Sequence, residues 1–153
     1  MTNIGVISDT HGLLRPEVIT ILCGVDYIIH AGDIGDPQVI EQLKTIAAVH
    51  AIKGNIDREM WANKFDDKAQ IEIAGHKIFV IHNRDDLAFD PSCKGFNIVV
   101  SGHSHKPSIE TINGVLYLNP GSAGPCRFTL PIALATLRFI GNTLEPTIHE
   151  IEI

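Results

Sequence analysis

Seven side chains that can bind a divalent metal fall in five short clusters, each directly after an apolar, β-branched run. They are Asp9, His11, Asp33, Asn55, His82, His103 and His105. Because side chains alternate between the two faces of a strand, ligands from several strands converge most readily where each strand ends and the chain turns. The repeated placement therefore predicts a metal centre built from strand ends.

The ligand types favour a first-row transition metal. Carboxylate, amide oxygen and imidazole without thiolate suit manganese, zinc, iron or nickel, and four histidines argue against calcium or magnesium alone. Seven protein ligands exceed what one such ion takes, so we expect two divalent ions that share a bridging carboxylate. Asp33 stands alone in its cluster after Gly32, and it is the expected bridge.

Each of these residues also has a simpler interpretation. An isolated aspartate after glycine, such as Asp33, is more often a turn residue or a helix cap, and a single histidine after a strand, such as His82, is more often a polar terminus. The ordered set of five clusters reverses that preference. His30, His50, His76 and His149 lack ligand spacing and are expected at the surface or behind the ligands, with His30 the best candidate for a supporting role.

The elements that must position these residues alternate between strand and helix in the first half of the chain. Short apolar runs predict strands at residues 4–7, 27–30 and 48–53, and a short helix is expected over 15–22. The clearest helix follows Asp36, a good N-cap, with Pro37 at its first position. The second half predicts strands at 69–73, 77–81 and 97–100, with hairpins at Gly75-His76, Asn113-Gly114 and Gly141-Asn142.

This order predicts an α/β (α+β) architecture in one domain over residues 1–153. Early strands joined by helices should pair in parallel, whereas strands joined by tight hairpins must be antiparallel, so the sheet should be mixed.

Composition excludes several other classes of protein. With 44% hydrophobic and 20% charged residues the chain is not disordered, and a net charge of −6 argues against a generic basic surface for nucleic acid or membrane. No apolar stretch is long enough to span a bilayer, so we expect a cytoplasmic protein. Cys23, Cys93 and Cys126 lack metal or redox spacing and are expected to be reduced thiols, mostly in the core. The composition leaves oligomeric state open, so a homo-oligomer is possible.

The five clusters, in this order, resemble the calcineurin-like metallophosphoesterases, and the chain length resembles their short prokaryotic phosphodiesterase branch. The sequence carries Asp-x-His, Gly-Asp, Gly-Asn-x-Asp, a lone His and Gly-His-x-His. The segments 30–36, 102–107 and 119–122 (Asn-Pro-Gly-Ser) are similar to that branch in particular, and the likeness runs nearly end to end.

The resemblance implies a fold of two packed mixed β-sheets flanked by helices, a four-layer sandwich. It also implies that Asp9, His11, Asp33 and His105 hold one metal, and that Asp33, Asn55, His82 and His103 hold the other. Two such cations lie about 3.5–4 Å apart, lower the pKa of a shared water and neutralise phosphoryl charge. The implied activity is hydrolysis of small phosphodiesters or phosphomonoesters, with Asp9, His11, Asp33, Asn55 and His103 catalytic.

Three cations adjoin the motif loops and are expected to steady the substrate phosphate by ion pairing: Arg127, Arg58 and Lys106. Two residues depart from many relatives. Ile56 replaces a histidine that can assist the leaving group, and Asn83 replaces a glycine, where asparagine can still adopt left-handed backbone geometry. Asp57 is expected to orient a neighbour by hydrogen bonding rather than to bind metal.

Two other functions are compatible with such a chain. One branch of the family serves as a protein-binding subunit of a trafficking coat, so a non-catalytic scaffold is the main alternative; loss of ligands would favour it, and none is missing here. The second is a metal-dependent hydrolase of a non-phosphate ester or amide, and competitive inhibition by inorganic phosphate would argue against this hypothesis.

Overall fold

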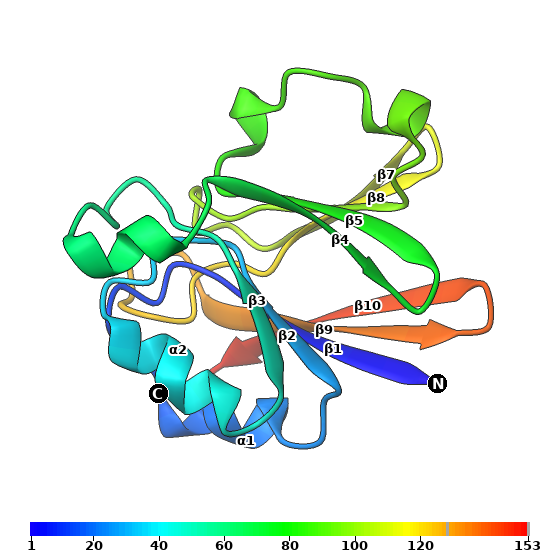
Figure 1. Cartoon of the computed structure of the whole chain (residues 1–153). Helices are drawn as coiled ribbons and strands as arrows, with labels where there is room; N and C mark the ends of the chain where they lie inside the picture. The colour runs from blue at the N-terminus through cyan, green and yellow to red at the C-terminus, as the bar shows by residue number, and fades with distance from the viewer. Residues whose placement is uncertain (128, 153) are drawn as a thin grey trace.

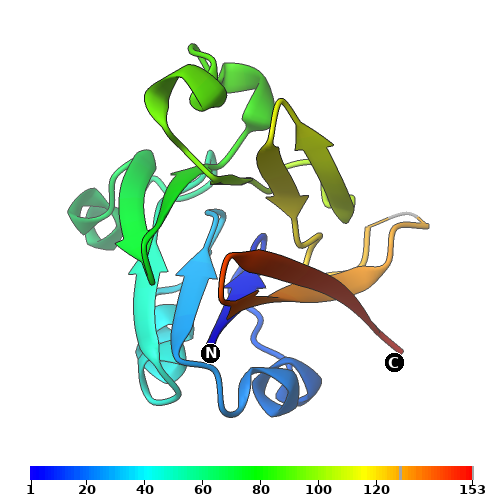
Figure 2. The same cartoon turned by 90° about the vertical axis from the view of Figure 1, so that its right-hand side faces the viewer.

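Two five-stranded sheets pack face to face in the computed structural model, which describes residues 1–127 and 129–152. The first sheet has the order β10-β9-β1-β2-β3 and the second β4-β5-β6-β8-β7 (Figure 1; Figure 2 shows the molecule turned by 90°). The strands of the first sheet are β1 (Thr2–Ile7), β2 (Tyr27–His30), β3 (Ala48–Ala51), β9 (Ile132–Ile140) and β10 (Thr143–Ile151). Those of the second are β4 (Lys68–Ile73), β5 (His76–Ile81), β6 (Ile98–Val100), β7 (Ser108–Ile112) and β8 (Val115–Asn119).

Both sheets are mixed, as predicted. Strands β1, β2 and β3 are parallel, and so are β5, β6 and β8, whereas the hairpin partners β9, β10, β4 and β7 run antiparallel to their neighbours. Two of the hairpins turn through Ala74-Gly75 and Asn113-Gly114, where both residues have positive φ, as a tight hairpin turn requires. The first of these turns lies one residue earlier than predicted, because His76 already pairs with Ile73.

Regular helices cover one face of the first sheet only. They are α1 (Pro16–Leu22) and α2 (Pro37–Lys44), and α2 begins as predicted, with the Gln38 N–H donating to Asp36 Oδ1 at 2.9 Å. The outer face of the second sheet is covered instead by the segment carrying the short 3-10 helices η2 (Arg84–Asp86) and η3 (Pro91–Lys94). A further 3-10 helix, η1 (Met60–Lys64), follows β3.

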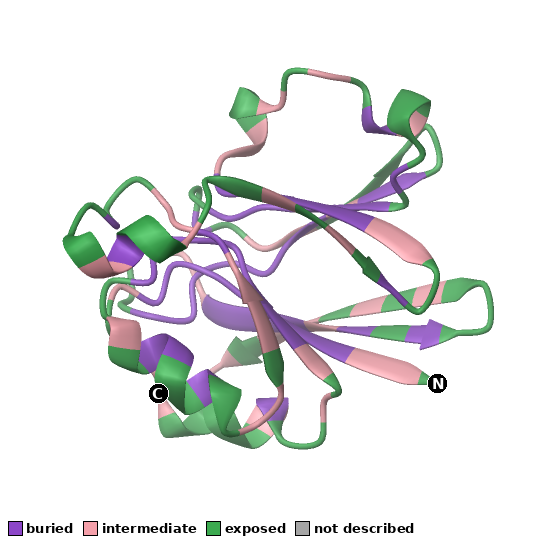
Figure 3. Ribbon diagram, viewed as in Figure 1, coloured by how far each residue is buried: buried purple, intermediate pink, exposed green. Residues whose placement is uncertain are grey.

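The main core lies between the sheets (Figure 3). Ile4 and Val6 of β1 and Ile78 and Val80 of β5 all belong to this buried apolar cluster. A second cluster packs α1 and α2 against the first sheet, and a third packs Phe79 and neighbouring residues under η2 and η3. Burial of both faces of the central parallel strands explains why their sequences are continuous apolar runs rather than alternating ones.

Three sequence predictions need correction. The cysteines Cys23, Cys93 and Cys126 are all exposed, so they are not core residues. Strand β3 ends at Ala51 rather than at Lys53, because the Lys53 N–H donates to Asp66 O in the segment before β4 instead of continuing the ladder with β2. Asn83 has an extended backbone with φ −112° and ψ 116°, so left-handed geometry is not used there. No helix of the described chain is long and apolar enough to cross a membrane.

Candidate metal centre

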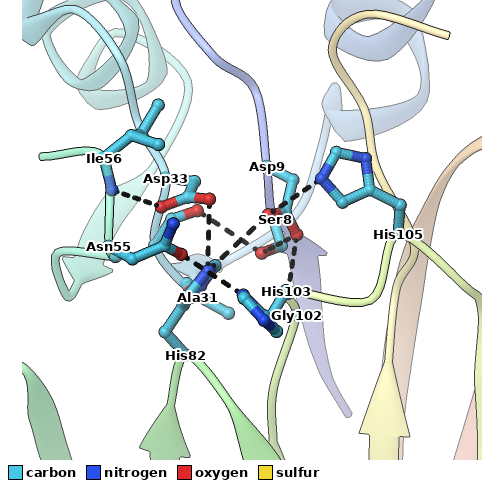
Figure 4. A network of polar contacts seen from close by, with 12 residues as sticks. Ser8, Asp9, Ala31, Asp33, Asn55, Ile56, His82, Gly102, His103 and His105 are labelled. Carbon is cyan, nitrogen blue, oxygen red and sulfur yellow. Dashed lines mark hydrogen bonds and ion pairs between the residues drawn. The ribbon is translucent and has the colours of Figure 1, made fainter. Parts of the chain in front are cut away.

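Strand ends bring the seven predicted ligands together, and all of them except His11 are labelled in Figure 4. Asp9 and His11 follow β1, Asp33 follows β2 and Asn55 follows β3. From the second sheet, His82 directly follows β5, and the pair His103 and His105 follows β6. Because β1, β2 and β3 are parallel, and β5 and β6 are parallel, their carboxyl ends lie at one edge of each sheet.

The two carboxylate oxygens of Asp9 have different partners. Oδ2 accepts hydrogen bonds from Ser8 Oγ at 2.8 Å and from the His103 N–H at 3.0 Å, which fix the carboxylate in place. Oδ1 faces three imidazole nitrogens, with His105 Nε2 at 3.4 Å, His82 Nε2 at 3.8 Å and His11 Nε2 at 3.9 Å. One oxygen is therefore anchored by the protein and the other is presented to the histidines.

The two carboxylate oxygens of Asp33 also have different partners. Its Oδ1 accepts the Ile56 N–H at 3.1 Å, while its Oδ2 lies 3.2 Å from His82 Nε2 and 3.6 Å from His11 Nε2. His82 is itself oriented by its other nitrogen, since Nδ1 lies 2.7 Å from Ala31 O and donates to it. In the metal-free chain a proton on Nε2 can donate to Asp33; with that proton removed, the ring would present the Nε2 lone pair, which is the usual arrangement of a metal-binding histidine.

The Asn55 amide can face this cluster with either end. With its nitrogen inward it would donate to His82 Nε2 at 3.0 Å and to Asp33 Oδ2 at 3.3 Å. With its oxygen inward it lies 3.2 Å from His103 Nδ1 and adds one more lone pair to a group of lone pairs. The second orientation is favourable when a cation sits among these atoms, because amide oxygen is then a ligand.

The arrangement fits bound divalent metals. Asp9, His11 and His105 offer ligand atoms within 4.8 Å of one another, and so do Asp9, Asp33 and His82. Asp9 Oδ1 and His11 Nε2 are buried without a hydrogen-bond partner, although buried polar atoms normally have one. A cation between them would satisfy both atoms. The two groups share Asp9, and the Asp33 Oδ2 contact with His11 links them a second time.

Backbone strain is concentrated at the same residues. Among the described non-glycine residues, seven have positive φ. Five of them are predicted ligands, namely Asp9 (55°), His11 (47°), Asp33 (56°), His103 (69°) and His105 (61°). The other two, Ala74 and Asn113, lie in hairpin turns. Left-handed geometry costs free energy for residues with a β-carbon and persists where the surroundings enforce it, most often at functional sites.

Two glycines permit the close approach of these loops. A β-carbon on Gly54 would collide with Asp33 Oδ1 and its backbone nitrogen, and one on Gly102 would collide with Ser8 Oγ and lie 2.6 Å from Asp9 Oδ2. Both glycines therefore allow the chain to pass directly against the two carboxylates.

The carboxylates differ in pKa. Burial raises the pKa of Asp9 to about 6, although His82 and Ser8 act in the opposite direction. Burial also acts to raise the pKa of Asp33, but the hydrogen bond and charge of His82 and the Ile56 N–H outweigh it, so that the pKa falls to about 2. Asp33 is therefore ionised throughout the neutral range, whereas Asp9 ionises as the pH passes about 6.

The pKa values of His11 and His105 are lowered, whereas that of His82 is raised. Burial and the charge of Arg127 lower the pKa of His105 to about 4, and burial with the same arginine lowers the pKa of His11. At His82 burial acts to lower the pKa, but hydrogen bonds to Asp33 and to Ala31 O raise it overall. Neutral imidazoles at His11 and His105 keep the lone pairs that metal binding needs.

A second layer of residues fixes the ligand loops. His30 is completely buried, with Nε2 3.0 Å from Thr10 Oγ1 and Nδ1 accepting the Gly32 N–H at 3.1 Å, and burial lowers its pKa to about 3. Since the Thr10 hydroxyl donates to Ile34 O, the His30 Nε2–H donates to Thr10. His30 thus joins the loop of Asp9 and His11 to that of Asp33, which confirms the expected supporting role.

Asp57 joins the loops of Asp33 and Asn55. Its carboxylate accepts the N–H groups of Ile34, Gly35 and Gly54, each at 2.9 Å, and the residue is buried. This orienting contact is the one expected from the sequence. Asn119 and Ser122 also support ligand loops: the Asn119 amide donates to Gly102 O and Ser104 Oγ, and the Ser122 hydroxyl donates to Asp9 O.

The three predicted phosphate-binding cations are placed differently from one another. Arg127 is exposed, and its charge acts on His11 and His105. Arg58 is exposed beside the Asn55 loop, where its Nε donates to Asn55 O at 2.9 Å. Lys106 is exposed after His105, and its ammonium makes no hydrogen bond or ion pair with any residue that the structure describes.

A cleft of about 330 Å³ opens beside the Asn55, His82 and His103 side of the centre. Its remaining lining residues are Lys53, Gly54, Asp67, Lys68, Ile81, Asn83 and Asp86. Sequence reasoning missed Lys53 and Lys68 as candidate functional residues. Lys53 stands two positions before Asn55, which is the only sequence signal that could have indicated it.

Comparison with known proteins identifies the family and the fold. Residues 2–140 match the calcineurin-like phosphoesterase superfamily domain, and the chain belongs to this family. A probable metallophosphoesterase of Methanothermobacter thermautotrophicus is 33% identical over 157 residues, covering 95% of this chain and 90% of that protein.

Solved structures show the same architecture. A structure described as a novel archaeal phosphodiesterase superposes with a TM-score of 0.80 at 26% identity, covering 97% of this chain and all of that one (100%). Vps29 of Chaetomium thermophilum superposes with a TM-score of 0.79 over 98% of this chain and 95% of that one, but at 15% identity, so this likeness concerns the fold alone.

Proposed function

We propose that the chain is a dinuclear metal-dependent phosphoesterase that hydrolyses small phosphodiesters. The proposal rests mainly on the contacts of two carboxylates. Asp9 and Asp33 each accept a hydrogen bond from the protein with one oxygen and turn the other oxygen toward imidazole nitrogens. In this proposal Asp9, His11 and His105 hold one metal, and Asn55, His82 and His103 hold the other. Asp33, whose Oδ2 lies near both His11 and His82, is shared between the two metals.

Two divalent ions, when bound, would supply a hydroxide nucleophile near neutral pH and neutralise charge on the phosphoryl group. The chain's own residues would then orient the substrate and stabilise the negative charge of its phosphoryl group. Arg127, whose charge acts on His11, would pair with a phosphoryl oxygen, and so would Arg58, which donates to Asn55 O. Ile56 cannot donate a proton, so esters with good leaving groups are the expected preferred substrates. The diester preference is supported by the 26% identity to the archaeal phosphodiesterase.

The test is a reconstitution series. Protein freed of metal with a chelator is loaded with manganese, zinc, nickel or iron and assayed against bis(4-nitrophenyl) phosphate and 4-nitrophenyl phosphate. We expect turnover only after loading, with manganese among the activating ions, and near-complete loss in Asp33→Ala, with the exposed Lys44→Met of α2 as the control. Protein that binds metal and hydrolyses neither ester would contradict the proposal and favour the scaffold function. Hydrolysis of carboxylic esters without inhibition by inorganic phosphate would favour a metal-dependent hydrolase of non-phosphate esters or amides.

A further inference from the structure

The cleft beside the metal centre has an uneven charge distribution. Four charged residues line it, Lys53, Asp67, Lys68 and Asp86, and three of them are exposed. Lys53 differs, because its side chain is only 28% exposed. Its partner Asp67 is 83% exposed and 3.9 Å away, a geometry in which an ion pair is weak and screened by solvent. Of these two lysines and two aspartates, the least exposed is therefore a lysine.

The position of Lys53 relative to the metal ligands is fixed by the backbone. The Lys53 N–H donates to Asp66 O at 2.9 Å, which holds the end of the β3 connection against the segment before β4. Asn55 follows two residues later, and both residues line the same cleft with His82 and His103. If a phosphoester is held at Asn55 and His103, as in the proposed function, one of its substituents would lie beside this cleft.

Most of the residues that line the cleft have polar or charged side chains. Ile81 is the one apolar side chain among the described lining residues, and none of them is Phe, Tyr or Trp. Asn83 adds an amide, and Lys68 adds a second ammonium at the rim. Ammonium groups on flexible stems act as point charges that suit a phosphate group of variable position.

We propose that the cleft is a subsite for a second anionic group of the substrate, a terminal phosphate, held by Lys53 with assistance from Lys68. The inference rests on the proposed function and deepens it: the substrate class would be phosphoesters of an alcohol that itself carries a phosphate. A volume of about 330 Å³ accommodates a short alcohol and its phosphate, at the lower end of small-molecule sites.

Calorimetric binding to manganese-loaded protein tests the inference without turnover. The probes are propyl phosphate and propane-1,3-diol bisphosphate, which differ by one phosphate group. We expect wild-type protein to bind the bisphosphate about tenfold more tightly, which is the effect of one charge-assisted contact. Lys53→Met should bring the affinity ratio close to one, Lys53→Arg should retain most of it, and Lys68→Met should lower it less, because that side chain is exposed.

The control is Lys44→Met, which removes a lysine of α2 that pairs only with Glu41 among the described residues and should leave the ratio unchanged. A ratio near one in wild-type protein, or a high ratio that survives Lys53→Met, would overturn the subsite. Failure of the proposed function has a different signature: no hydrolysis of bis(4-nitrophenyl) phosphate, whatever the ratio of the two binding constants.

Discussion

Replacement of Asp57 by asparagine tests how the ligand loops are held together. The Asp57 carboxylate accepts three backbone N–H groups at 2.9 Å, from Ile34 and Gly35 after Asp33 and from Gly54 before Asn55. An asparagine at this position has one acceptor oxygen, so it can keep the two bonds that Oδ2 makes, to Ile34 and Gly54. Its NH2 group then faces the Gly35 N–H, and both are donors.

The magnitude follows from these contacts. Hydrogen bonds to a charged acceptor contribute about 1.5–3 kcal/mol and neutral ones about 0.5–1.5 kcal/mol, while a partly buried N–H left without an acceptor costs about 1–3 kcal/mol. Two weakened bonds and one lost bond give an expected loss of about 3 kcal/mol in the free energy of unfolding. Because the loops of Asp33 and Asn55 also separate, metal affinity should fall about 10- to 100-fold.

Urea denaturation of chelator-treated protein measures the stability change, with the fluorescence of Trp61, the single tryptophan, as the probe. Calorimetric titration with manganese measures the affinity. The matched control is Asp67→Asn, because Asp67 is 83% exposed and has one weak ion pair. The reasoning is refuted if Asp57→Asn lies within about 0.5 kcal/mol of that control, the range of ordinary surface substitutions, and binds manganese equally well.

Three further predictions concern the same site. Ile56→His should raise activity toward esters with poor leaving groups, because the residue is 41% exposed and its hydrogen bond to Asp33 comes from the backbone N–H, which the substitution keeps; an unchanged leaving-group profile would refute the missing-acid interpretation. Gly54→Ala should lower manganese affinity at least about tenfold while the far-ultraviolet circular dichroism stays native, because the new β-carbon collides with Asp33; equal affinity would show that the loops can move apart. Metal-free protein should lose stability as the pH falls from 6.5 toward 4, because burial holds the pKa of His30 at about 3 and that of His105 at about 4, so the unfolded chain binds more protons in this window. The raised pKa of Asp9, about 6, offsets part of this loss between pH 6 and 4, and a urea midpoint that rises on acidification would contradict the assignment.

Much of the architecture could be predicted because local signals and global fold agree. The continuous apolar runs before Asp9, Asp33 and His82 are strands buried on both faces, and their ends lie where the ligands were expected. The Asp36 side chain itself accepts the hydrogen bond that begins α2, and Asn113 and Gly114 themselves tolerate the positive φ that their turn requires. Such features depend on few residues, so a sequence reveals them.

Features that depend on packing between distant segments could not be predicted. The end of β3 follows from the backbone contact of Lys53 with Asp66 before β4, and the Lys53 side chain is only 28% exposed; no local sequence pattern predicts either feature. The exposure of Cys23, Cys93 and Cys126 likewise depends on which face each loop presents. Sequence order also did not indicate that Asp9 Oδ1 approaches histidines from both sheets, because that contact depends on how the sheets pack.

Anomalous diffraction from a crystal grown with manganese tests the central claim most directly. The account predicts two anomalous peaks about 3.5–4 Å apart, one beside Asp9, His11 and His105 and one beside Asp33, Asn55, His82 and His103. A single peak would contradict the dinuclear centre. Peaks only elsewhere, or none among these seven side chains, would contradict the whole assignment of the site.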